Sequence, residues 1–243
     1  MPDPIFHYLD ARRPARILLC AEHAGVDVPS DLGGMGIETS ELYRHIGWDL
    51  GIDPLARRLH EQTGYPAFLG RYSRLVADLN RPADSPECVI ECSDGTPIPA
   101  NTGLSGAQHQ ARIDTYHQPF HQAFSGLLAR LEPDCILSLH SFTPMLRAEG
   151  IPRPWHCGIL YGSANGLAGR CLAYLNGIPG LVVGDNQPYR VESDHDYTIP
   201  VHGDSHRIPT VIVEIRNDLI GNDRGQRYWT DILCGMMTCC CTG

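Results

Sequence analysis

The chain has 243 residues, of which 42% are hydrophobic, and carries a formal net charge of −9 at pH 7. A chain of this length can bury a sizeable core within one domain. Its basic residues are scattered along an acidic sequence, which excludes the concentrated positive surface that nucleic-acid binding needs. We expect a single domain over residues 1–243, with its core at about residues 16–222.

The first ten residues, MPDPIFHYLD, lack the basic start and apolar run of a signal peptide, and no apolar run is long enough to span a bilayer. The ten cysteines form no CxxC pair, and three of them stand together as Cys239-Cys240-Cys241. The sequence therefore predicts a cytoplasmic protein with mostly reduced thiols and no membrane partner. It indicates neither an oligomeric state nor a role for the three-cysteine tail.

Short apolar runs typical of strands alternate along the chain with helical patterns. The predicted strands are Arg16–Cys20, Leu75–Leu79, Cys135–His140, His156–Gly162, Leu181–Gly184 and Thr210–Ile215. The predicted helices are Thr39–Gln62 with a break near Gly51, Ser105–Leu131, Asn165–Asn176 and Gln226–Met237. Runs such as TVIVEI are almost entirely apolar, as in strands buried on both faces. This order predicts an α/β fold with a mixed, mostly parallel sheet flanked by helices. A polar stretch rich in Pro and Gly, Arg81–Gly103, predicts a long functional or mobile loop.

Reactive side chains follow the ends of three predicted strands. Glu22 and His23 follow the first, His140 ends the third, and Glu214 lies at the end of the last. Because ligands bind beyond the carboxyl ends of strands in open α/β sheets, we expect these side chains at one rim. Two histidines and a carboxylate suit a zinc hydrolase, in which another carboxylate serves as base for the attacking water.

The stretch ELYRHIGWDLG supplies a further candidate ligand. Leu42, Ile46 and Asp49 recur at helical spacing, which predicts Asp49 on the apolar face of a helix. A carboxylate there is costly unless it is paired or bound to a cation. His45, four residues earlier, is a candidate hydrogen-bond partner for Asp49. The alternatives are structural ion pairs, of Asp49 with an arginine and of Glu214 with Arg216.

Other histidines compete for the metal site. His117 and His121 have the spacing of a helical metal pair, but no HExxH glutamate is present and Pro119 lies between them. We therefore expect both to be structural residues at the edge of a buried helical stripe. In the stretch ESDHDYTIPVHGDSH, His202 is a candidate cavity-lining residue. We expect the other two histidines of that stretch, His195 and His206, to be exposed.

A nucleophilic mechanism is the rival chemistry. Cys20 and Ser141 each lie near a histidine and are candidate nucleophiles. No G-x-S-x-G motif accompanies Ser141, and Cys20 has the character of an apolar strand end. The sequence therefore favours the metal site over a covalent mechanism.

The stretch RYSRLVADLNRP contains a group of candidate anion-binding residues. If Leu75–Leu79 is a strand, Arg74 and Asp78 share one face, and Asp78 holds Arg74 in place. Arg81 can bind a carboxylate through two parallel hydrogen bonds, and Asn80 adds an amide donor. These groups predict a small anionic substrate such as an acyl amino acid.

The same pieces occur together in one known family. CAEHAGVDVP, RHIGWDLG, SRLVADLNRP, PFHQAF, LHSFTP and VIVEIRNDLI lie in order from about residue 16 to residue 222. In this set the chain resembles the N-formylglutamate amidohydrolase family. The resemblance implies an α/β fold like that of the zinc-dependent exopeptidases, and hydrolysis of N-formylglutamate or a similar substrate. It also implies a divalent metal, expected to be zinc, bound by His23, Asp49 and His140.

The resemblance implies roles for further residues. Glu214 corresponds to the general base, the Asn80-Arg81 pair to the group that holds a substrate carboxylate, and Arg216 to a contact for a second carboxylate or the polarised carbonyl. One departure is that the His and Glu of related zinc enzymes stand three residues apart, whereas Val26 occupies that position here. Either Asp49 or Glu22 must then complete the site. Asp49 is favoured, because adjacent strand residues point to opposite faces. The alternative to an enzyme is a non-catalytic protein that binds acyl amino acids or related metabolites on the same fold.

Overall fold

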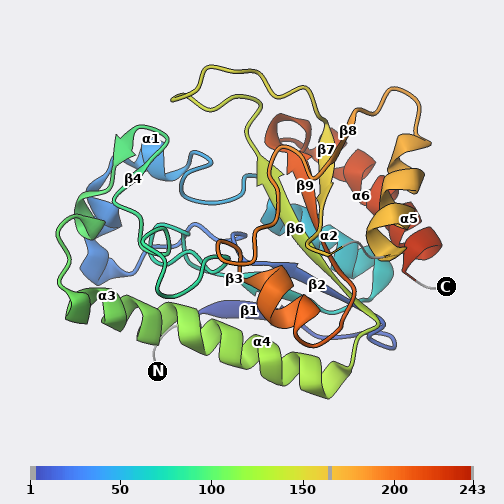
Figure 1. The fold of residues 1–243 in the computed structure, drawn as a ribbon. Coiled ribbons are helices and arrows are strands. Elements are labelled where there is room, and N and C mark those ends of the chain that lie inside the picture. Colours follow the sequence, from blue (N-terminus) through green and yellow to red (C-terminus); the bar gives the residue numbers. More distant parts are fainter. Residues whose placement is uncertain (1–3, 164–165, 242–243) are drawn as a thin grey trace.

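The computed structural model describes residues 4–163 and 166–241, which are arranged around a seven-stranded sheet (Figure 1). In order across the sheet, the strands are β1 (Phe6–Leu9), β3 (Ala67–Gly70), β2 (Ile17–Ala21), β6 (Cys135–Phe142), β9 (Thr210–Arg216), β7 (Cys157–Leu160) and β8 (Val183–Asp185). The β1–β3 and β7–β9 pairs are antiparallel, and the other four pairs are parallel. The predicted α/β fold with a mixed, mostly parallel sheet is confirmed.

The helices are α1 (Thr39–Leu42), α2 (Ile52–Thr63), α3 (Gly106–Arg112), α4 (Gln118–Leu131), α5 (Gly166–Asn176) and α6 (Asp223–Cys240). A π-helical turn, Ile113–His117, joins α3 and α4 into the long green helix of Figure 1. That helix begins at the predicted place because Ser105 and Gln108 form a reciprocal capping box. The predicted start of the next helix, Asn165, lies outside the described residues. No helix in the described part of the chain is long and apolar enough to cross a membrane.

Alternate residues of the central strands pack against different helices. Leu19 of β2 belongs to a core formed with α2, α5 and α6. Its neighbour Leu18, with Ile136 of β6, packs instead against Phe124 of α4. Burial on both faces explains the continuous apolar runs of these strands. His140 lies four residues after Ile136 and therefore on the α4 face of the sheet, beyond the end of that core.

The prediction of a strand at Leu75–Leu79 is wrong. This segment forms turns, and its backbone hydrogen bonds are largely local, with the N–H of Val76 donating to the carbonyl of Ser73 at 2.9 Å. Its apolar side chains enter three separate clusters rather than one sheet face. The strand that reaches this part of the site is β3, which ends at Gly70 just before the segment begins.

The predicted helix Thr39–Gln62 is interrupted over a longer stretch than expected. α1 ends at Leu42 and α2 begins at Ile52, after Gly51 with a φ of 83° that favours glycine. Asp49 therefore lies in an irregular segment and not on a helix face. Its backbone N–H donates to the carbonyl of His23 at 2.9 Å, which holds the two residues side by side.

The long loop predicted at Arg81–Gly103 contains a small hairpin, β4 (Cys92–Ser93) and β5 (Thr96–Pro97). At its tip Asp94 accepts hydrogen bonds from Arg44 at 2.6 Å and from the backbone N–H of Ala148 at 2.8 Å. The loop is thereby tied to two other segments beside the cavity described below.

Candidate active site

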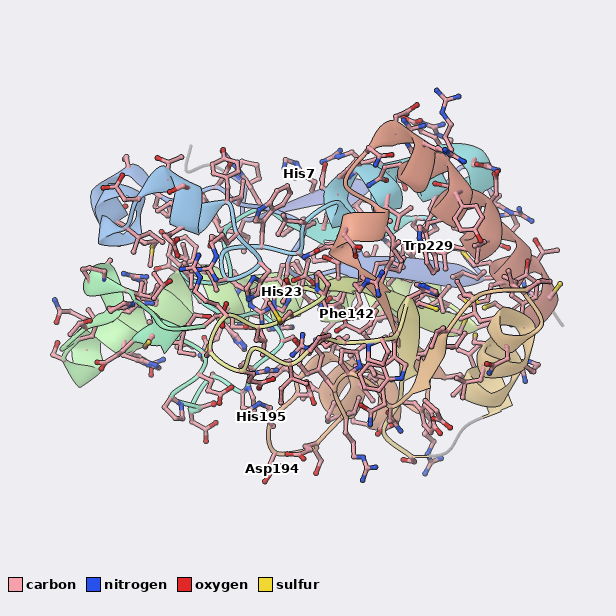
Figure 2. All side chains as sticks on the ribbon, turned by 90° about the horizontal axis from the view of Figure 1, so that it is seen from above. His7, His23, Phe142, Asp194, His195 and Trp229 are labelled. Atoms are coloured by element: carbon pink, nitrogen blue, oxygen red, sulfur yellow. The ribbon has the colours of Figure 1, made fainter. Side chains whose placement is uncertain are left out.

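Three parallel strands deliver polar side chains to one edge of the sheet. Glu22 and His23 follow β2, His140 lies near the end of β6, and Glu214 lies near the end of β9. His140 and Glu214 are direct neighbours in the β6–β9 register. All four side chains are buried, and three of them line a cavity of about 560 Å³, Glu22 lying behind it. Seen from above, His23 lies near the middle of the molecule (Figure 2).

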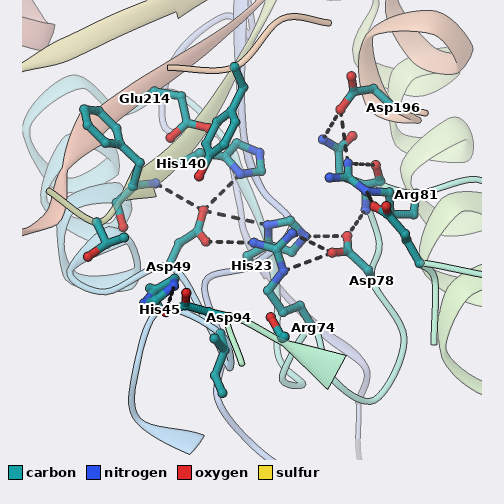
Figure 3. A pocket seen from close by; sticks show the side chains of 18 of the residues that line it. His23, His45, Asp49, Arg74, Asp78, Arg81, Asp94, His140, Asp196 and Glu214 are labelled. Atoms are coloured by element: carbon teal, nitrogen blue, oxygen red, sulfur yellow. Dashed lines mark hydrogen bonds and ion pairs between the residues drawn. The ribbon is translucent and has the colours of Figure 1, made fainter. Parts of the chain in front are cut away.

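His23, Asp49 and His140 converge in this cavity, with one ligand atom of each within 4.8 Å of the others. The Nδ1 atom of His140 lies 2.9 Å from Oδ2 of Asp49, and Nδ1 of His23 lies 3.7 Å from the same oxygen (Figure 3). Nδ1 of His23 is buried without a hydrogen-bond partner. Such an atom is costly unless something binds it. Two imidazoles and a carboxylate with an unsatisfied nitrogen fit a divalent cation, and are the donor set of many zinc hydrolases.

The second ring nitrogen of each histidine faces a carboxylate. Nε2 of His23 lies 2.7 Å from Oδ1 of Asp78, and Nε2 of His140 lies 3.1 Å from Oε2 of Glu22. Such outer carboxylates accept a hydrogen bond from Nε2–H, which leaves the Nδ1 lone pair for a cation. Because Glu22 lies on the Nε2 side of His140, the carboxylate placed between the two Nδ1 atoms is that of Asp49.

Glu22 is held by two hydroxyl groups besides the imidazole. Ser138 donates to its Oε2 at 2.8 Å, and Thr198 donates to its Oε1. Burial raises the pKa of Glu22, but the bond and charge of His140, with the hydroxyl of Thr198, lower it below its usual range. Glu22 is therefore a carboxylate that can orient His140.

His140 stands between two carboxylates, those of Asp49 and Glu22. Burial alone lowers the pKa of His140, but hydrogen bonds with Asp49 and Glu22 raise it well above its ordinary value. The pKa of Asp49 is lowered in turn by the two histidines, against the effect of its burial. The two carboxylates thus favour a proton on His140, and a cation bound at that imidazole would compete with this proton.

Glu214 has a different environment from the other carboxylates. It is 6% exposed, and its Oε2 atom is buried with no hydrogen-bond partner. Burial is the main reason why the pKa of Glu214 is raised to about 7, with the charge of Asp49 adding to the rise. A carboxylate with this pKa beside a cation site suits proton transfer near neutral pH.

The predicted anion-binding pair already contacts acidic side chains. Arg81 lies 3.2 Å from Oδ1 of Asp196 and 3.2 Å from Oε2 of Glu87. Asn80 donates to the same oxygen of Asp196 at 3.3 Å, and its own oxygen accepts from the backbone N–H of Thr198 at 3.0 Å. Both donors thus meet on one carboxylate oxygen inside the cavity.

Arg74 is held in place by two aspartates. Its guanidinium lies 2.6 Å from Oδ2 of Asp78 and 3.6 Å from Oδ1 of Asp49. The sequence-based pairing of Arg74 with Asp78 is present, although it forms across a turn and not along a strand. Arg74 lines the cavity and joins the outer carboxylate of His23 to the carboxylate of Asp49.

Three sequence-based candidates lie elsewhere than expected. The guanidinium of Arg216 is held by Asp218 at 2.8 Å and is not among the cavity-lining groups. His202 is buried behind the site, with Nε2 2.9 Å from Nδ1 of His121, because its π-helical segment turns it toward α4. His45 faces Asp94 at 3.4 Å and not Asp49.

The remaining histidines mostly follow their predicted environments. His117 and His121 are buried at the inner side of the long helix, and His206 is exposed. The prediction for His195 is only partly right, since its side chain is 40% exposed but lines the rim of the cavity near Glu87. Figure 2 shows His195 toward the periphery of the molecule.

The candidate nucleophiles lack the required geometry. Cys20 is buried in β2, and burial raises the pKa of its thiol well above the ordinary value. The hydroxyl of Ser141 donates to the carbonyl of Leu50 at 3.0 Å and is not paired with a histidine. The described site therefore contains no nucleophile–base pair at either position.

Sequence reasoning missed several groups of the site. Ser138 could have been predicted from the sequence, because it precedes His140 by two residues on the same strand and so shares its face. Thr198 and Asp196 could not have been predicted in this way. The contact of Thr198 with Glu22 and that of Asp196 with Arg81 each span more than 110 residues of sequence. Only the fold brings this segment to the cavity.

Comparison with known proteins shows the family and related folds. A family model described as N-formylglutamate amidohydrolase matches residues 15–221. A gene product of Agrobacterium tumefaciens of known structure is 32% identical, with a TM-score of 0.90 and coverage of 97% of this chain and 94% of that one. The structure of an N-formylglutamate amidohydrolase from Ralstonia eutropha is 21% identical, with a TM-score of 0.68 and coverage of 96% and 97%. No curated protein matches the chain.

The fold, the site and the family match together define a hydrolase that acts on amides. More particularly, the chain belongs to the N-formylglutamate amidohydrolase family.

Proposed function

We propose that this protein hydrolyses the amide bond of a small N-formyl or N-acyl amino acid with the help of a divalent metal ion, expected to be zinc. The supporting observation is the convergence of His23 Nδ1, His140 Nδ1 and the Asp49 carboxylate, with the His23 nitrogen unsatisfied. A cation held there would polarise the amide carbonyl and make a nearby water more acidic. Glu22 and Asp78 keep both imidazoles in the tautomer that such a cation needs.

Glu214 is the proposed general base. Its buried, unpartnered oxygen and its pKa of about 7 allow it to accept the proton of the attacking water. The same carboxyl group then returns that proton to the leaving amine. Its register position beside His140 and its place in the lining of the same cavity support this role.

Arg81 and Asn80 are the proposed contacts for the carboxylate of the amino acid. A single oxygen of Asp196 accepts hydrogen bonds from both Asn80 and Arg81. We propose that a substrate carboxylate takes the position of this oxygen. Binding of the substrate therefore exchanges one carboxylate for another at Arg81. The cost of stripping water from the guanidinium is small, since Arg81 is already mostly buried.

The test is an assay of the purified protein on N-formyl and N-acyl amino acids before chelation, after chelation and after zinc is restored. We expect hydrolysis that is lost with the metal and returns with it. Undiminished hydrolysis by metal-free protein would refute the metal mechanism. Tight binding of acyl amino acids without turnover in the zinc-loaded protein would support the non-catalytic alternative.

A further inference from the structure

The sheet face beside Glu214 forms an apolar floor to the cavity. Ile212 precedes Glu214 by two residues on β9, so both side chains point to the same face. Leu160 of β7 is the register partner of Ile212 across the sheet. Both residues line the cavity, yet each is only 3% exposed. We call Leu160 and Ile212 the apolar floor.

The apolar floor is supported from behind and from the side. Leu160 and Ile212 form a cluster with Ile199 and, at its edge, Val191. Gly158 stands opposite Glu214 in the register, and a Cβ atom there would lie 1.9 Å from the carbonyl oxygen of Gln187. The segment after β8 therefore passes close over the sheet here, and this contact requires glycine. The apolar floor is therefore supported by its own hydrophobic cluster and is bounded on one side by the backbone at Gln187.

The charge of the cavity opposes a second carboxylate on the substrate. Of the three arginines that line it, Arg74 and Arg81 are already paired with aspartate or glutamate side chains, and Arg190 alone has no ion pair within the described part of the chain. Eight carboxylates line the same cavity, namely Asp49, Asp78, Glu87, Asp94, Glu149, Glu192, Asp196 and Glu214. Even with a divalent cation in place, this lining repels a dianion more than a monoanion.

The proposed chemistry orients the substrate relative to the floor. The amine that leaves must lie within hydrogen-bond reach of Glu214, which returns its proton. Its carboxylate points to Arg81, which lies on the other side of the histidine and aspartate group from Glu214 (Figure 3). The remaining substituent of the α-carbon is the amino-acid side chain. Ile212 lies roughly 7 Å from Glu214 along the strand, so a long side chain such as that of methionine is needed to reach toward it.

We infer that the apolar floor binds the side chain of the amino acid that is released, and that this side chain is apolar and not acidic. The inference rests on the proposed function for the direction of the substrate, and it specifies the substrate class of that same site. Leu160 and Ile212 are its specificity-determining residues.

The first test compares four N-formyl amino acids whose side chains differ in charge and polarity. Methionine, glutamine and glutamate have side chains of similar length, and glycine gives the rate without a side chain. We expect kcat/KM for N-formylmethionine to exceed the values for N-formylglutamine and N-formylglutamate by at least about tenfold. A preference for N-formylglutamate that disappears in Arg190→Gln would overturn the inference and assign that side chain to Arg190.

The second test uses matched variants of one apolar cluster. Ile212 lines the cavity, whereas Ile199 packs in the same cluster but does not line it. We expect Ile212→Ala to lower the methionine-to-glycine ratio of kcat/KM by about tenfold, and Ile199→Ala to leave the ratio unchanged. Because the ratio compares two substrates of one sample, partial unfolding cancels. Equal ratios in wild type and Ile212→Ala would contradict the assignment.

A binding measurement separates this inference from the proposed function. Calorimetry on zinc-loaded Glu214→Gln protein gives the affinity for each N-formyl amino acid without turnover. Tighter binding of N-formylmethionine than of N-formylglutamate supports the apolar floor even if the wild-type protein hydrolyses none of them, which would refute only the proposed function. Equal binding, or tighter binding of N-formylglutamate, would overturn the inference itself.

Discussion

His23 and His140 have the same arrangement, in which Nε2 faces a carboxylate and Nδ1 faces Asp49. An imidazole can offer only one lone pair to a cation, so the partner of the other nitrogen decides which atom binds. The outer carboxylates Asp78 and Glu22 are therefore as much a part of the candidate site as the three proposed ligands. This explains why two acidic groups are buried where neither touches the cation position.

The outer carboxylate of His140 can be tested directly. Glu22→Gln keeps the shape of the side chain but replaces one acceptor oxygen with a donor amide. We expect zinc affinity to fall about 10–100-fold, measured by competition with a chromophoric chelator. Asp134→Asn, which removes an exposed partner of Arg16, serves as the control and should leave the affinity unchanged. An unchanged affinity in Glu22→Gln would show that the imidazole is oriented by other groups.

The role of Glu214 predicts a loss of rate without a loss of metal. Glu214→Gln should lower kcat by about 10²-fold or more, because the amide cannot accept the proton of the water. Zinc content, measured by elemental analysis, should remain at the wild-type value, since Glu214 is not one of the three converging groups. A rate close to wild type would remove Glu214 from the role of base.

The raised pKa of Glu214 predicts the pH dependence of the reaction. A base must be deprotonated, so activity is present above its pKa and is lost as the pH falls through it. Burial raises the pKa of Glu214 to about 7, and a bound cation would favour the carboxylate and lower that value. We expect an acid limb of kcat/KM at or below pH 7, and its absence from the residual rate of Glu214→Gln. The same acid limb in that variant would assign it to another group.

At the scale of elements, the buried central strands β2, β6 and β9 were the most predictable part of the fold. β2, β6 and β9 are buried on both faces, so their apolar runs leave little ambiguity. The turn segment at Leu75–Leu79 has similar composition, but its side chains enter different clusters, and sequence alternation cannot show this. Two strands of the seven-stranded sheet were missed: β1, which is short and only partly buried at the edge of the sheet, and β3, which is buried but only four residues long.

Asp49 shows how a candidate residue can lie in the site although the element predicted for it is wrong. The helical spacing that suggested it does not exist, since the residues between Leu42 and Ile52 form turns. The physical argument still applies to Asp49, because a buried carboxylate among apolar neighbours needs a partner. Asp49 is 2% exposed and has two histidines and an arginine around it.

Close packing of strand ends gives a prediction at this scale. A Cβ atom on Gly70, at the end of β3, would lie 2.0 Å from the carbonyl oxygen of Glu22. Gly70→Ala should therefore displace the segment that carries His23, lowering both the melting temperature and the zinc affinity. Gly126→Ala is the matched control, because Gly126 lies in α4 with open space around it. That control should raise the free energy of unfolding by about 0.5–1 kcal/mol. Equal effects of the two substitutions would contradict the packing argument.

At the scale of the whole molecule, the site is assembled from segments far apart in the sequence. The segment after β2, the loop before α2, β6 and β9 supply the groups around the proposed cation position, and His195 and Asp196 of the segment near residue 197 line the cavity. The rule that ligands bind beyond the carboxyl ends of parallel strands predicts the first group. No local pattern predicts the last, because its hydrogen bonds to Asn80 and Glu22 depend on the complete fold.

The central claim is that His23, Asp49 and His140 together hold a catalytic metal ion. Anomalous diffraction from crystals of the zinc-loaded protein locates the ion directly. The account predicts one ion per chain, at about 2.0–2.2 Å from Nδ1 of His23, Nδ1 of His140 and a carboxylate oxygen of Asp49. An ion bound instead between Glu22 and Nε2 of His140, or no ion at these residues under saturating zinc, would contradict it.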